Sequence, residues 1–251
     1  FGHFGIPALG ITGAAIGSSL AELMSLIFFV VYTRTSCDRQ KYGLDKPAKA
    51  EMAELKSMMP VCTWTMIQHT ISISTWLIFF LYIEHLGERA LAISNIARGV
   101  SGLIWVVLQA FSSTCSTLVS NIIGAGREDK VWSLLKRILK LSYGVVMSFA
   151  LIFCIFPSAV ISIYTDIPDL IPATIPSMLV MCSSYLFTVG AMVLFQAVSG
   201  TGSTKTAFRL ELAALVIYTL YCTVIVGIMK LDVAICWTAE HVYAFMLMLC
   251  S

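Results

Sequence analysis

Long apolar runs recur along the chain, and short clusters of charged residues separate them. Five runs contain no Asp, Glu, Lys or Arg; they span residues 58–83, 99–126, 141–165, 170–204 and 212–229. Two further runs are apolar but hold ionisable residues: 11–33 contains Glu22, and 233–251 contains Glu240 and His241. A helix that crosses a bilayer needs about 20 mostly apolar residues, and the runs lack the alternation of membrane β-barrel strands. The pattern predicts an all-α, polytopic transmembrane helix bundle with about seven spanning helices.

Basic residues fall on alternate connections between these runs. Of the 16 Lys and Arg residues, six lie in 34–56, five in 127–140 and two in 205–209. The connections at 84–89, 165–169 and 230–232 carry little positive charge. Cytoplasmic loops of membrane proteins are enriched in Lys and Arg, so the basic connections are assigned to the cytoplasm. The first span then enters from the outside, and the last one ends inside.

Composition narrows the functional classes. The chain has 251 residues, of which 58% are hydrophobic and 12% charged, and its net charge is +2. A soluble domain carries roughly 25% charged residues and a nucleic-acid binder carries a basic stripe, so both classes are excluded. Seven of the eight cysteines lie in apolar surroundings, Cys37 being the exception, and none has CxxC spacing. This usage excludes a disulfide-stapled module.

The chain contains no recognisable catalytic or metal-binding constellation. Its four histidines show no HExxH spacing, so no metal site and no cofactor are expected. The string GTGSTKT at 200–206 resembles a phosphate loop, but Thr204 stands where that loop has Gly. It is interpreted as a tight cytoplasmic turn with glycines at positive φ, and Gly124-Ala125-Gly126 as a helix stop. An enzyme is therefore not expected.

Polar residues inside the spans are the candidate site residues, because such groups are costly in hydrocarbon and often line a cavity. On the second span, three of them share one helix face, and two on the fifth are separated by a multiple of four. The candidate substrate-binding residues are Gln68, His69, Ser72, Asn95, Thr188 and Gln196. For the hydroxyl residues, hydrogen bonding between helices is the alternative interpretation.

Three ionisable residues are candidates for a gate or an ion pair. Arg98 lies near the outer end of its helix, where it must either snorkel to the membrane surface or pair with a carboxylate. Glu22 and Glu240 each follow an Ala, in helices that run from outside to inside. Matching positions in two such helices are expected from a parallel internal repeat, as in transporters built from two related lobes.

Four strings resemble motifs of the multidrug and toxic compound extrusion (MATE) transporters. FGIPALGITGAA at 4–15 is similar to the segment that leads into the sixth helix of that family. HLGERALAISN at 85–95 resembles the link from the seventh helix to the eighth, and STLVSNIIGAG at 116–126 resembles the end of the eighth. QAVSGTGST at 196–204 resembles the turn after the tenth. The motifs occur in family order and cover nearly the whole chain.

The resemblance implies a division into parts. Residues 1–34 would be the last helix of the N-terminal lobe, 35–56 a basic cytoplasmic linker, and 57–251 the C-terminal six-helix lobe. The remaining helices of the N-terminal lobe are expected in the same polypeptide. The protein would then act as a monomer in the bacterial cytoplasmic membrane.

The resemblance also implies efflux of amphipathic, often cationic, drugs or metabolites by alternating access, coupled to the inward flow of Na⁺ or H⁺. One branch of the family binds the coupling cation at acidic positions that match Ser72 and Thr188. Neither residue is acidic here, so the resemblance points to the branch whose coupling acids lie on the first helix. The C-terminal lobe would then mainly form the wall of the substrate cavity.

Two rival functions share this helical plan. A lipid-linked oligosaccharide or polysaccharide flippase of the same superfamily would need more Lys and Arg in the spans to hold a pyrophosphate. A seven-helix receptor or retinal protein fits the number of helices, but the last span lacks a Lys for a Schiff base. Drug efflux is the preferred interpretation.

The assigned orientation predicts the accessibility of Cys37. A membrane-impermeant maleimide should label this thiol from the cytoplasmic side only, because it lies in the basic stretch after the first span. The measurement is labelling of right-side-out and inverted vesicles, with Cys37→Ser as the control for background from the other cysteines. Labelling from the outside alone would overturn the orientation.

Overall fold

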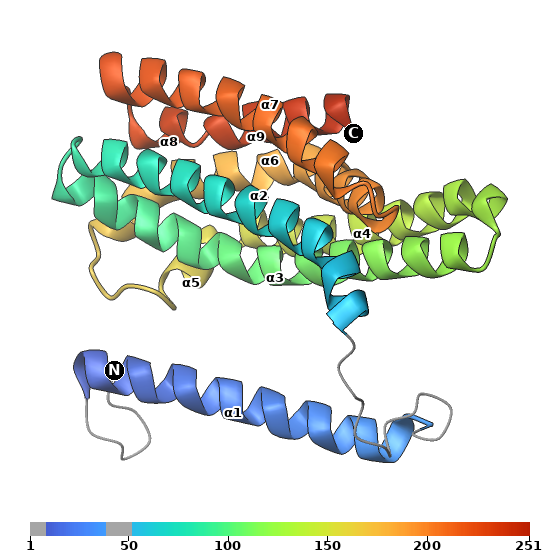
Figure 1. The fold of residues 1–251 in the computed structure, drawn as a ribbon. Helices are drawn as coiled ribbons and strands as arrows, with labels where there is room; N and C mark the ends of the chain where they lie inside the picture. The colour runs from blue at the N-terminus through green and yellow to red at the C-terminus, as the bar shows by residue number, and fades with distance from the viewer. Residues whose placement is uncertain (1–8, 39–51) are drawn as a thin grey trace. The chain divides into compact units, whose positions relative to one another are not determined.

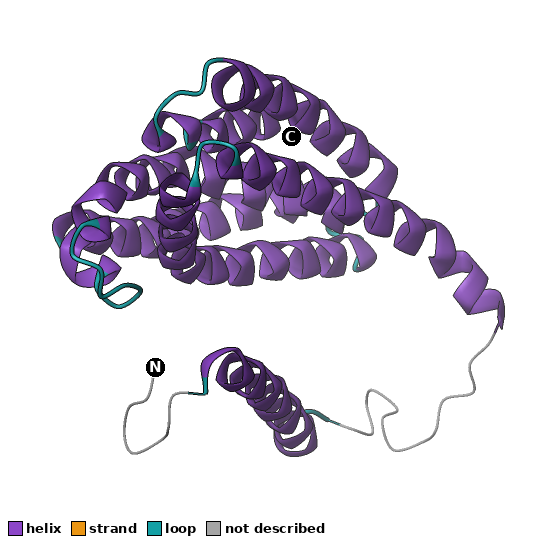
Figure 2. Cartoon of the chain, turned by 90° about the vertical axis from the view of Figure 1, so that its left-hand side faces the viewer, coloured by secondary structure: helices purple, strands orange, loops and turns teal. Residues whose placement is uncertain are grey.

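The computed structural model describes residues 9–38 and 52–251, which are almost entirely helical (Figure 1, Figure 2). No strand occurs in either of these stretches. Seven helical segments within them are long and apolar enough to cross a membrane. The predicted all-α fold and the predicted number of spans are therefore confirmed, and the chain is a multi-pass membrane protein.

The chain divides into two compact units, Phe1–Leu55 and Lys56–Ser251. Within the first, α1 (Gly10–Ser36) is one uninterrupted helix without a buried side chain. Apolar residues occur all round this helix, as expected where lipid is its solvent. Residues 1–8 and most of the predicted linker, 39–51, lie outside the described residues. The assignment of α1 to a separate lobe remains a prediction.

The second unit contains the other six spans. They are α2 (Met52–Glu84), which begins just before the unit boundary, α3 (Glu88–Gly124), α4 (Val131–Ile155), α6 (Leu170–Gly200), α7 (Thr204–Cys222) continued by the π-helix η2 (Thr223–Ile228), and α8 (Val233–Cys236) followed by α9 (Ala239–Cys250). The short helices η1 (Glu128–Lys130) and α5 (Pro157–Ile161) lie in the connections on either side of α4.

The central helix of this unit is α6, in which more residues are buried than in any other helix described. It packs against α3, α4 and α9, and its contact with α3 is the most extensive in the unit. Val189 of α6 belongs to the same core cluster as Ile104 and Leu108 of α3, Val146 of α4 and Leu247 of α9. Lipid tails are as apolar as this core, so close packing rather than exclusion of water must stabilise it.

Glycines allow two local features of the bundle. Gly126 (φ +68°) and Gly202 (φ +82°) have the positive φ values expected at the predicted helix stop and tight turn, which are confirmed, whereas their cytoplasmic side remains a prediction. Gly200 serves close packing instead, because a Cβ atom there would lie 2.6 Å from the backbone oxygen of Ser116. Ser120 Oγ also donates a 2.6 Å hydrogen bond to Gly200 O. Small residues of this kind let two membrane helices approach closely.

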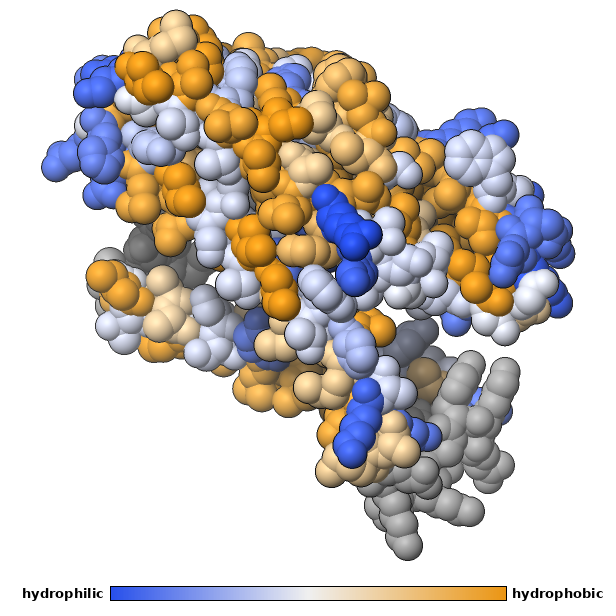
Figure 3. Space-filling view, turned by 45° about the horizontal axis from the view of Figure 1, so that its top comes forward, coloured by the Kyte–Doolittle hydropathy of each residue, from blue (hydrophilic) through white to orange (hydrophobic). Residues whose placement is uncertain are grey.

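The surface of the bundle matches a lipid environment. The face drawn in Figure 3 is mostly apolar, with hydrophilic residues at its two ends and in a patch near its middle. Large apolar side chains such as Leu77, Val106, Leu151 and Leu220 are exposed on the spans. In a soluble protein such a surface would promote aggregation, whereas in a bilayer lipid chains contact and solvate these side chains.

The predicted span 141–165 is misplaced. The helix α4 begins at Val131 and ends at Ile155. Lys136, Arg137 and Lys140 lie on its first turns, where long basic side chains can extend toward the membrane surface. The chain then bends at Pro157, whose nitrogen cannot donate a helical hydrogen bond. Charge therefore does not mark the start of this helix.

Three other predicted spans need correction. The spans 99–126 and 212–229 start too late, because Arg98 and Glu211 interrupt the apolar pattern although both residues lie inside helices, α3 and α7. The predicted span 233–251 is two helices, separated at Trp237 and Thr238. A broken helix leaves backbone groups free at a membrane depth where protein or a cavity must satisfy them.

The contact at Gly200 predicts a packing defect. Gly200→Ala should lower the melting temperature of the purified full-length protein, because overpacking a close helix contact costs about 1–3 kcal/mol. Gly144→Ala is the matched control, since a Cβ atom at Gly144 in α4 meets no neighbouring atom within 4 Å. Equal melting temperatures for the two variants would contradict the close approach of α6 to α3.

Candidate functional site

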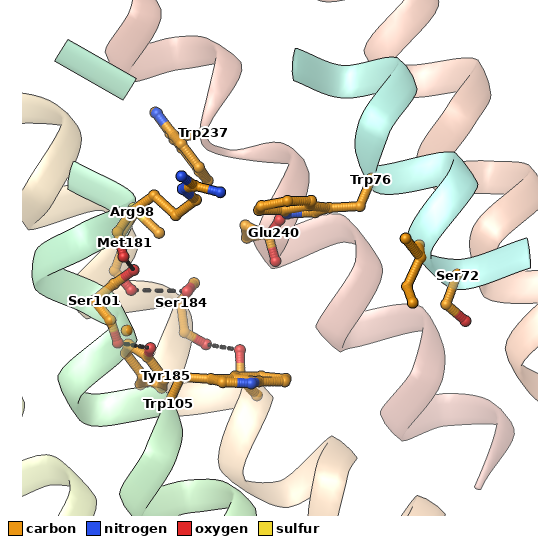
Figure 4. Close-up of a pocket in the computed structure, with 13 residues that line it drawn as sticks. Ser72, Trp76, Arg98, Ser101, Trp105, Met181, Ser184, Tyr185, Trp237 and Glu240 are labelled. Carbon is orange, nitrogen blue, oxygen red and sulfur yellow. Dashed lines mark hydrogen bonds between the residues drawn. The ribbon is translucent and has the colours of Figure 1, made fainter. Parts of the chain in front are cut away.

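A cavity of about 480 Å³ opens between α2, α3, α6 and the α8–α9 segment (Figure 4). Small-molecule sites typically have volumes of roughly 300–1,000 Å³, so an organic molecule of drug size fits this space. The lining residues are Ser72, Ile73, Trp76, Arg98, Ser101, Gly102, Trp105, Met181, Ser184, Tyr185, Thr188, Trp237 and Glu240.

Helical periodicity brings these residues together. On α3 and on α6, four residues separated by three, four and seven positions form one face toward the cavity: Arg98, Ser101, Gly102 and Trp105, and then Met181, Ser184, Tyr185 and Thr188. On α2, Ser72 and Trp76 are one turn apart, and Trp237 and Glu240 lie on either side of the break between α8 and α9. The cavity is thus made of one face from each helix.

The lining is aromatic, with hydroxyl groups that are already anchored. Tyr185 OH donates to Ser101 O at 2.9 Å, which joins α6 to α3 at the cavity wall. Ser184 Oγ and Thr188 Oγ1 donate to carbonyl oxygens of their own helix, at 2.7 and 2.9 Å. Each hydroxyl oxygen keeps lone pairs with which it can accept a hydrogen bond from a ligand. The walls therefore offer aromatic faces and acceptors.

Arg98 interacts with aromatic rings. Its guanidinium lies 5.2 Å from the ring centres of both Trp76 and Phe80, so a side chain of α3 is held on two rings of α2. Cation–π contacts contribute about 0.5–1 kcal/mol at exposed sites and about 2 kcal/mol where water is absent. No ion pair involving Arg98 is found in the described part of the chain. Its predicted role in a gate or ion pair remains a prediction.

Glu240 brings a carboxyl group to the cavity wall. It lies in the first turn of α9, immediately after the break at Trp237 and Thr238, and the positive end of the helix dipole favours an anion there. The break is held by Thr238 Oγ1, which is 2.5 Å from Ile235 O and 2.8 Å from Tyr221 OH. In Figure 4 Glu240 lies beneath Trp76, on the side of the cavity opposite Ser101.

The structure brings four of the predicted site residues into one cavity: Ser72, Arg98, Thr188 and Glu240. The other five lie elsewhere. Gln68 is buried on α2 in a separate small void, whereas His69 and Asn95 are exposed and Gln196 is half-buried, none of them in the cavity wall. Glu22 lies exposed on α1, in the first unit. The functional roles of all nine remain predictions.

The aromatic residues of the wall were not among the predicted site residues. Trp76, Trp105, Tyr185 and Trp237 carry no signal in a search for polar groups inside apolar runs. Their spacing was nevertheless informative: Trp105 lies seven residues after Arg98, and Tyr185 lies three before Thr188. Residues three, four or seven positions from a predicted polar site residue lie on the same helix face, so helical periodicity alone could have added them to the predicted site.

Glu211 is the other residue that sequence reasoning missed. It lies two turns into α7 with only 6% of its surface exposed, and Ser72 Oγ donates to its Oε1 atom. Tyr243 OH is 3.4 Å from the same oxygen. Its second oxygen, Oε2, has no hydrogen-bond partner among the described residues. A carboxyl group is thus present beside Ser72, where the pattern predicted none.

The fold and the cavity define a multi-pass α-helical membrane protein with a small-molecule-sized pocket inside one helix bundle. A comparison with known protein families shows to which of them the chain belongs. The family model described as MatE matches residues 65–224, which extends from α2 to η2. The chain therefore belongs to the MatE family, the family that its sequence motifs resemble.

Several curated proteins are similar to this chain. The Thermotoga maritima protein named "Probable multidrug resistance protein NorM" is 25% identical over 207 residues, which cover 81% of this chain and 44% of that protein. The Bacillus subtilis "Uncharacterized transporter YisQ" is 23% identical over 171 residues, covering 68% and 37% respectively. A protein of Shewanella oneidensis, again named "Probable multidrug resistance protein NorM", is 23% identical over 217 residues, covering 84% and 46%. The chain matches less than half the length of each.

The contact of Arg98 with α2 predicts an energetic coupling between two positions. Arg98→Met and Trp76→Leu should each lower the thermal stability of the full-length protein. Either change alone removes the contact between the guanidinium and the Trp76 ring. The loss of unfolding free energy in the double variant should therefore be about 0.5–1 kcal/mol smaller than the sum of the losses in the two single variants. A double-mutant cycle of melting curves measures this coupling. Strictly additive effects would mean that the two side chains do not interact.

Proposed function

We propose that this chain is part of a secondary active transporter that exports amphipathic, often cationic, drugs or metabolites. The observation that carries the proposal is the cavity of about 480 Å³, whose wall combines three Trp residues, Tyr185 and the carboxyl group of Glu240. Aromatic faces attract organic cations, and a carboxylate at the wall compensates their charge. Membership of the MatE family and the names of the NorM relatives support the same function.

The transport cycle in this proposal is alternating access, driven by the entry of Na⁺ or H⁺. The cavity would be exposed in turn to the two sides of a bacterial cytoplasmic membrane as the six-helix bundle moves against a second lobe of the same polypeptide. Arg98 would serve as a gate residue here. An organic cation that binds on Trp76 competes with the guanidinium for the same ring, so substrate entry would release α2 from α3.

A flippase for lipid-linked oligosaccharides is less well supported. A pyrophosphate carries several negative charges and is usually held by more than one Lys or Arg. Among the residues that line the cavity, Arg98 is the single basic one, and its guanidinium already lies on two aromatic rings. We therefore favour export of cationic amphipathic molecules.

The proposal predicts that two cavity variants reduce drug export. Trp105→Ala and Glu240→Gln in the full-length protein should each raise the KM for the cationic dye ethidium about tenfold, since each removes about 1.4 kcal/mol of binding. The measurement is dye efflux from loaded cells at matched expression.

Trp132→Ala is the matched control for these variants, because Trp132 is an exposed tryptophan of α4 that does not line the cavity. It should export the dye at the rate of the unmodified protein. If Trp105→Ala and Glu240→Gln also export at that rate, the cavity is not the substrate site.

A further inference from the structure

The carboxyl group of Glu211 is in an unusual environment for an ionisable residue. It lies inside the membrane span formed by α7 and η2, and 94% of its surface is buried, since 6% is exposed. Its neighbours in a small void are Gln68, Ile71, Phe208, Leu212 and Leu215. No Lys or Arg forms an ion pair with it within the described residues. An unpaired carboxylate in such surroundings costs several kcal/mol, so the group binds a cation or a proton.

The hydrogen bonds around Ser72 indicate which of these it binds. Ser72 Oγ donates to Glu211 Oε1 and also lies 2.9 Å from Gln68 O, which can only accept. A single hydroxyl hydrogen cannot make two full hydrogen bonds. If the carboxyl group carries a proton, Ser72 donates to Gln68 O and accepts from Glu211, so that both contacts become hydrogen bonds. With one additional proton on the carboxyl group, both contacts of Ser72 Oγ are therefore hydrogen bonds.

The size of the void leads to the same choice. The space between Gln68 and Glu211 does not admit a sphere the size of a water molecule, so a hydrated Na⁺ ion does not fit there in this conformation. A proton needs no additional space. The proton would be carried by Oε1, the oxygen that contacts Ser72 Oγ, so that Glu211 donates to Ser72 while Oε2 stays without a hydrogen-bond partner.

A second cavity is lined by residues that contact Glu211 and by residues of the substrate cavity, although Glu211 itself does not line it. It has a volume of about 70 Å³, enough for a water molecule or two, and Ser72, Tyr243 and Glu240 are among its lining residues. Ser72 and Tyr243 contact Glu211 on one side, and Glu240 and Ser72 line the substrate cavity on the other. Two hydroxyl groups and a cavity large enough for water thus lie between the two carboxyl groups.

The other ionisable groups around Glu211 are few. On α2, His69 is the nearest titratable residue and is exposed; on α9, they are Tyr243 and Glu240, whereas His241 faces Ser183 of α6. On α7 itself, Arg209 and Lys205 lie toward the cytoplasmic end and Tyr218 two turns further on. Neither α6 nor η2 contains an Asp, Glu, Lys, Arg or His residue. The charge of Glu211 is therefore governed mainly by its own protonation.

We propose that Glu211 is a proton-binding site of the transporter, which exchanges its proton with the substrate cavity through Ser72, Tyr243 and water. This inference rests on the proposed function and names a coupling group for it within the C-terminal lobe. Binding forms an O–H bond at Glu211 and breaks one at a hydronium ion of the small cavity, so the carboxylate is neutralised and water remains. Release reverses both steps when the small cavity is hydrated and Glu240 carries a negative charge.

The first test is spectroscopic and needs no transport activity. Infrared difference spectra of the purified full-length protein between low and high pH should contain the C=O stretching band of a protonated carboxylic acid. Glu211→Gln should lose this band, whereas Glu128→Gln, which removes an exposed acid of η1, should keep it. If the band is unchanged in Glu211→Gln, the proton is not on Glu211 and the proposal is overturned.

The second test uses proteoliposomes of the full-length protein and ethidium as the probe. Glu211→Gln should retain exchange of dye for dye, but its accumulation driven by a pH gradient should fall at least tenfold. Ser72→Ala, which leaves the carboxyl group in place, should keep the infrared band and shift the pH at which accumulation is half-maximal. The proposal would be contradicted if Glu211→Gln accumulated the dye under a pH gradient at the rate of the unmodified protein. It would also be contradicted if Glu211→Gln lost accumulation driven by a Na⁺ gradient but kept accumulation driven by a pH gradient.

The two tests separate this inference from the proposed function. If the unmodified protein does not move ethidium but the infrared band disappears in Glu211→Gln, the proton site stands and the proposed substrate class fails. If ethidium is exported and neither the infrared band nor the proton-driven accumulation depends on Glu211, the proposed transport function is supported and the proposed proton site is contradicted.

Discussion

The rest of this structure depends on one constraint: polar groups at membrane depth must find their partners within the protein, because hydrocarbon offers none. Most hydroxyl residues of the spans meet this constraint within their own helix. Thr70, Thr114 and Thr219, for example, donate to the carbonyl oxygen four residues earlier. Tyr185 and Glu211 instead have partners on other helices, Ser101 and Ser72, and Tyr185, Ser101 and Ser72 line the cavity.

The irregular parts of the bundle follow from the same constraint. The final span is interrupted at Trp237 and Thr238, where Thr238 Oγ1 donates to the backbone oxygen of Ile235 and also contacts Tyr221 OH. The break places Glu240 in the first turn of a helix that faces the cavity. On the preceding span, α7 changes to a π-helix at Thr223, whose hydroxyl lies 3.4 Å from Tyr82 OH of α2. Such π-helical turns are often found near functional sites.

Much of the fold could be predicted from the sequence, and the site only partly. The apolar runs, five of them uncharged, identified seven spans because a bilayer imposes a minimum apolar length, independently of how the helices pack. The bounds were less predictable, because Arg98 and Glu211 lie inside helices. Arg98 is accommodated by two aromatic rings, and for Glu211 we propose a proton. Ser72, Thr188 and Glu240 were predictable as polar residues in apolar runs, and the cavity contains all three.

The sequence by itself determined the class of protein, the number of spans and the identity of several groups that must avoid lipid. Hydropathy and motif order are local properties of the chain, so they can be read without knowing any contact. The tertiary structure alone decided which of those groups meet. Gln68 and Ser72 are one turn apart on the same helix, yet only Ser72 reaches the cavity, and Glu211 reaches Ser72 across 139 positions of the sequence. The physical reason is that burial and hydrogen bonding between helices depend on how each helix is rotated against its neighbours, which no single segment specifies.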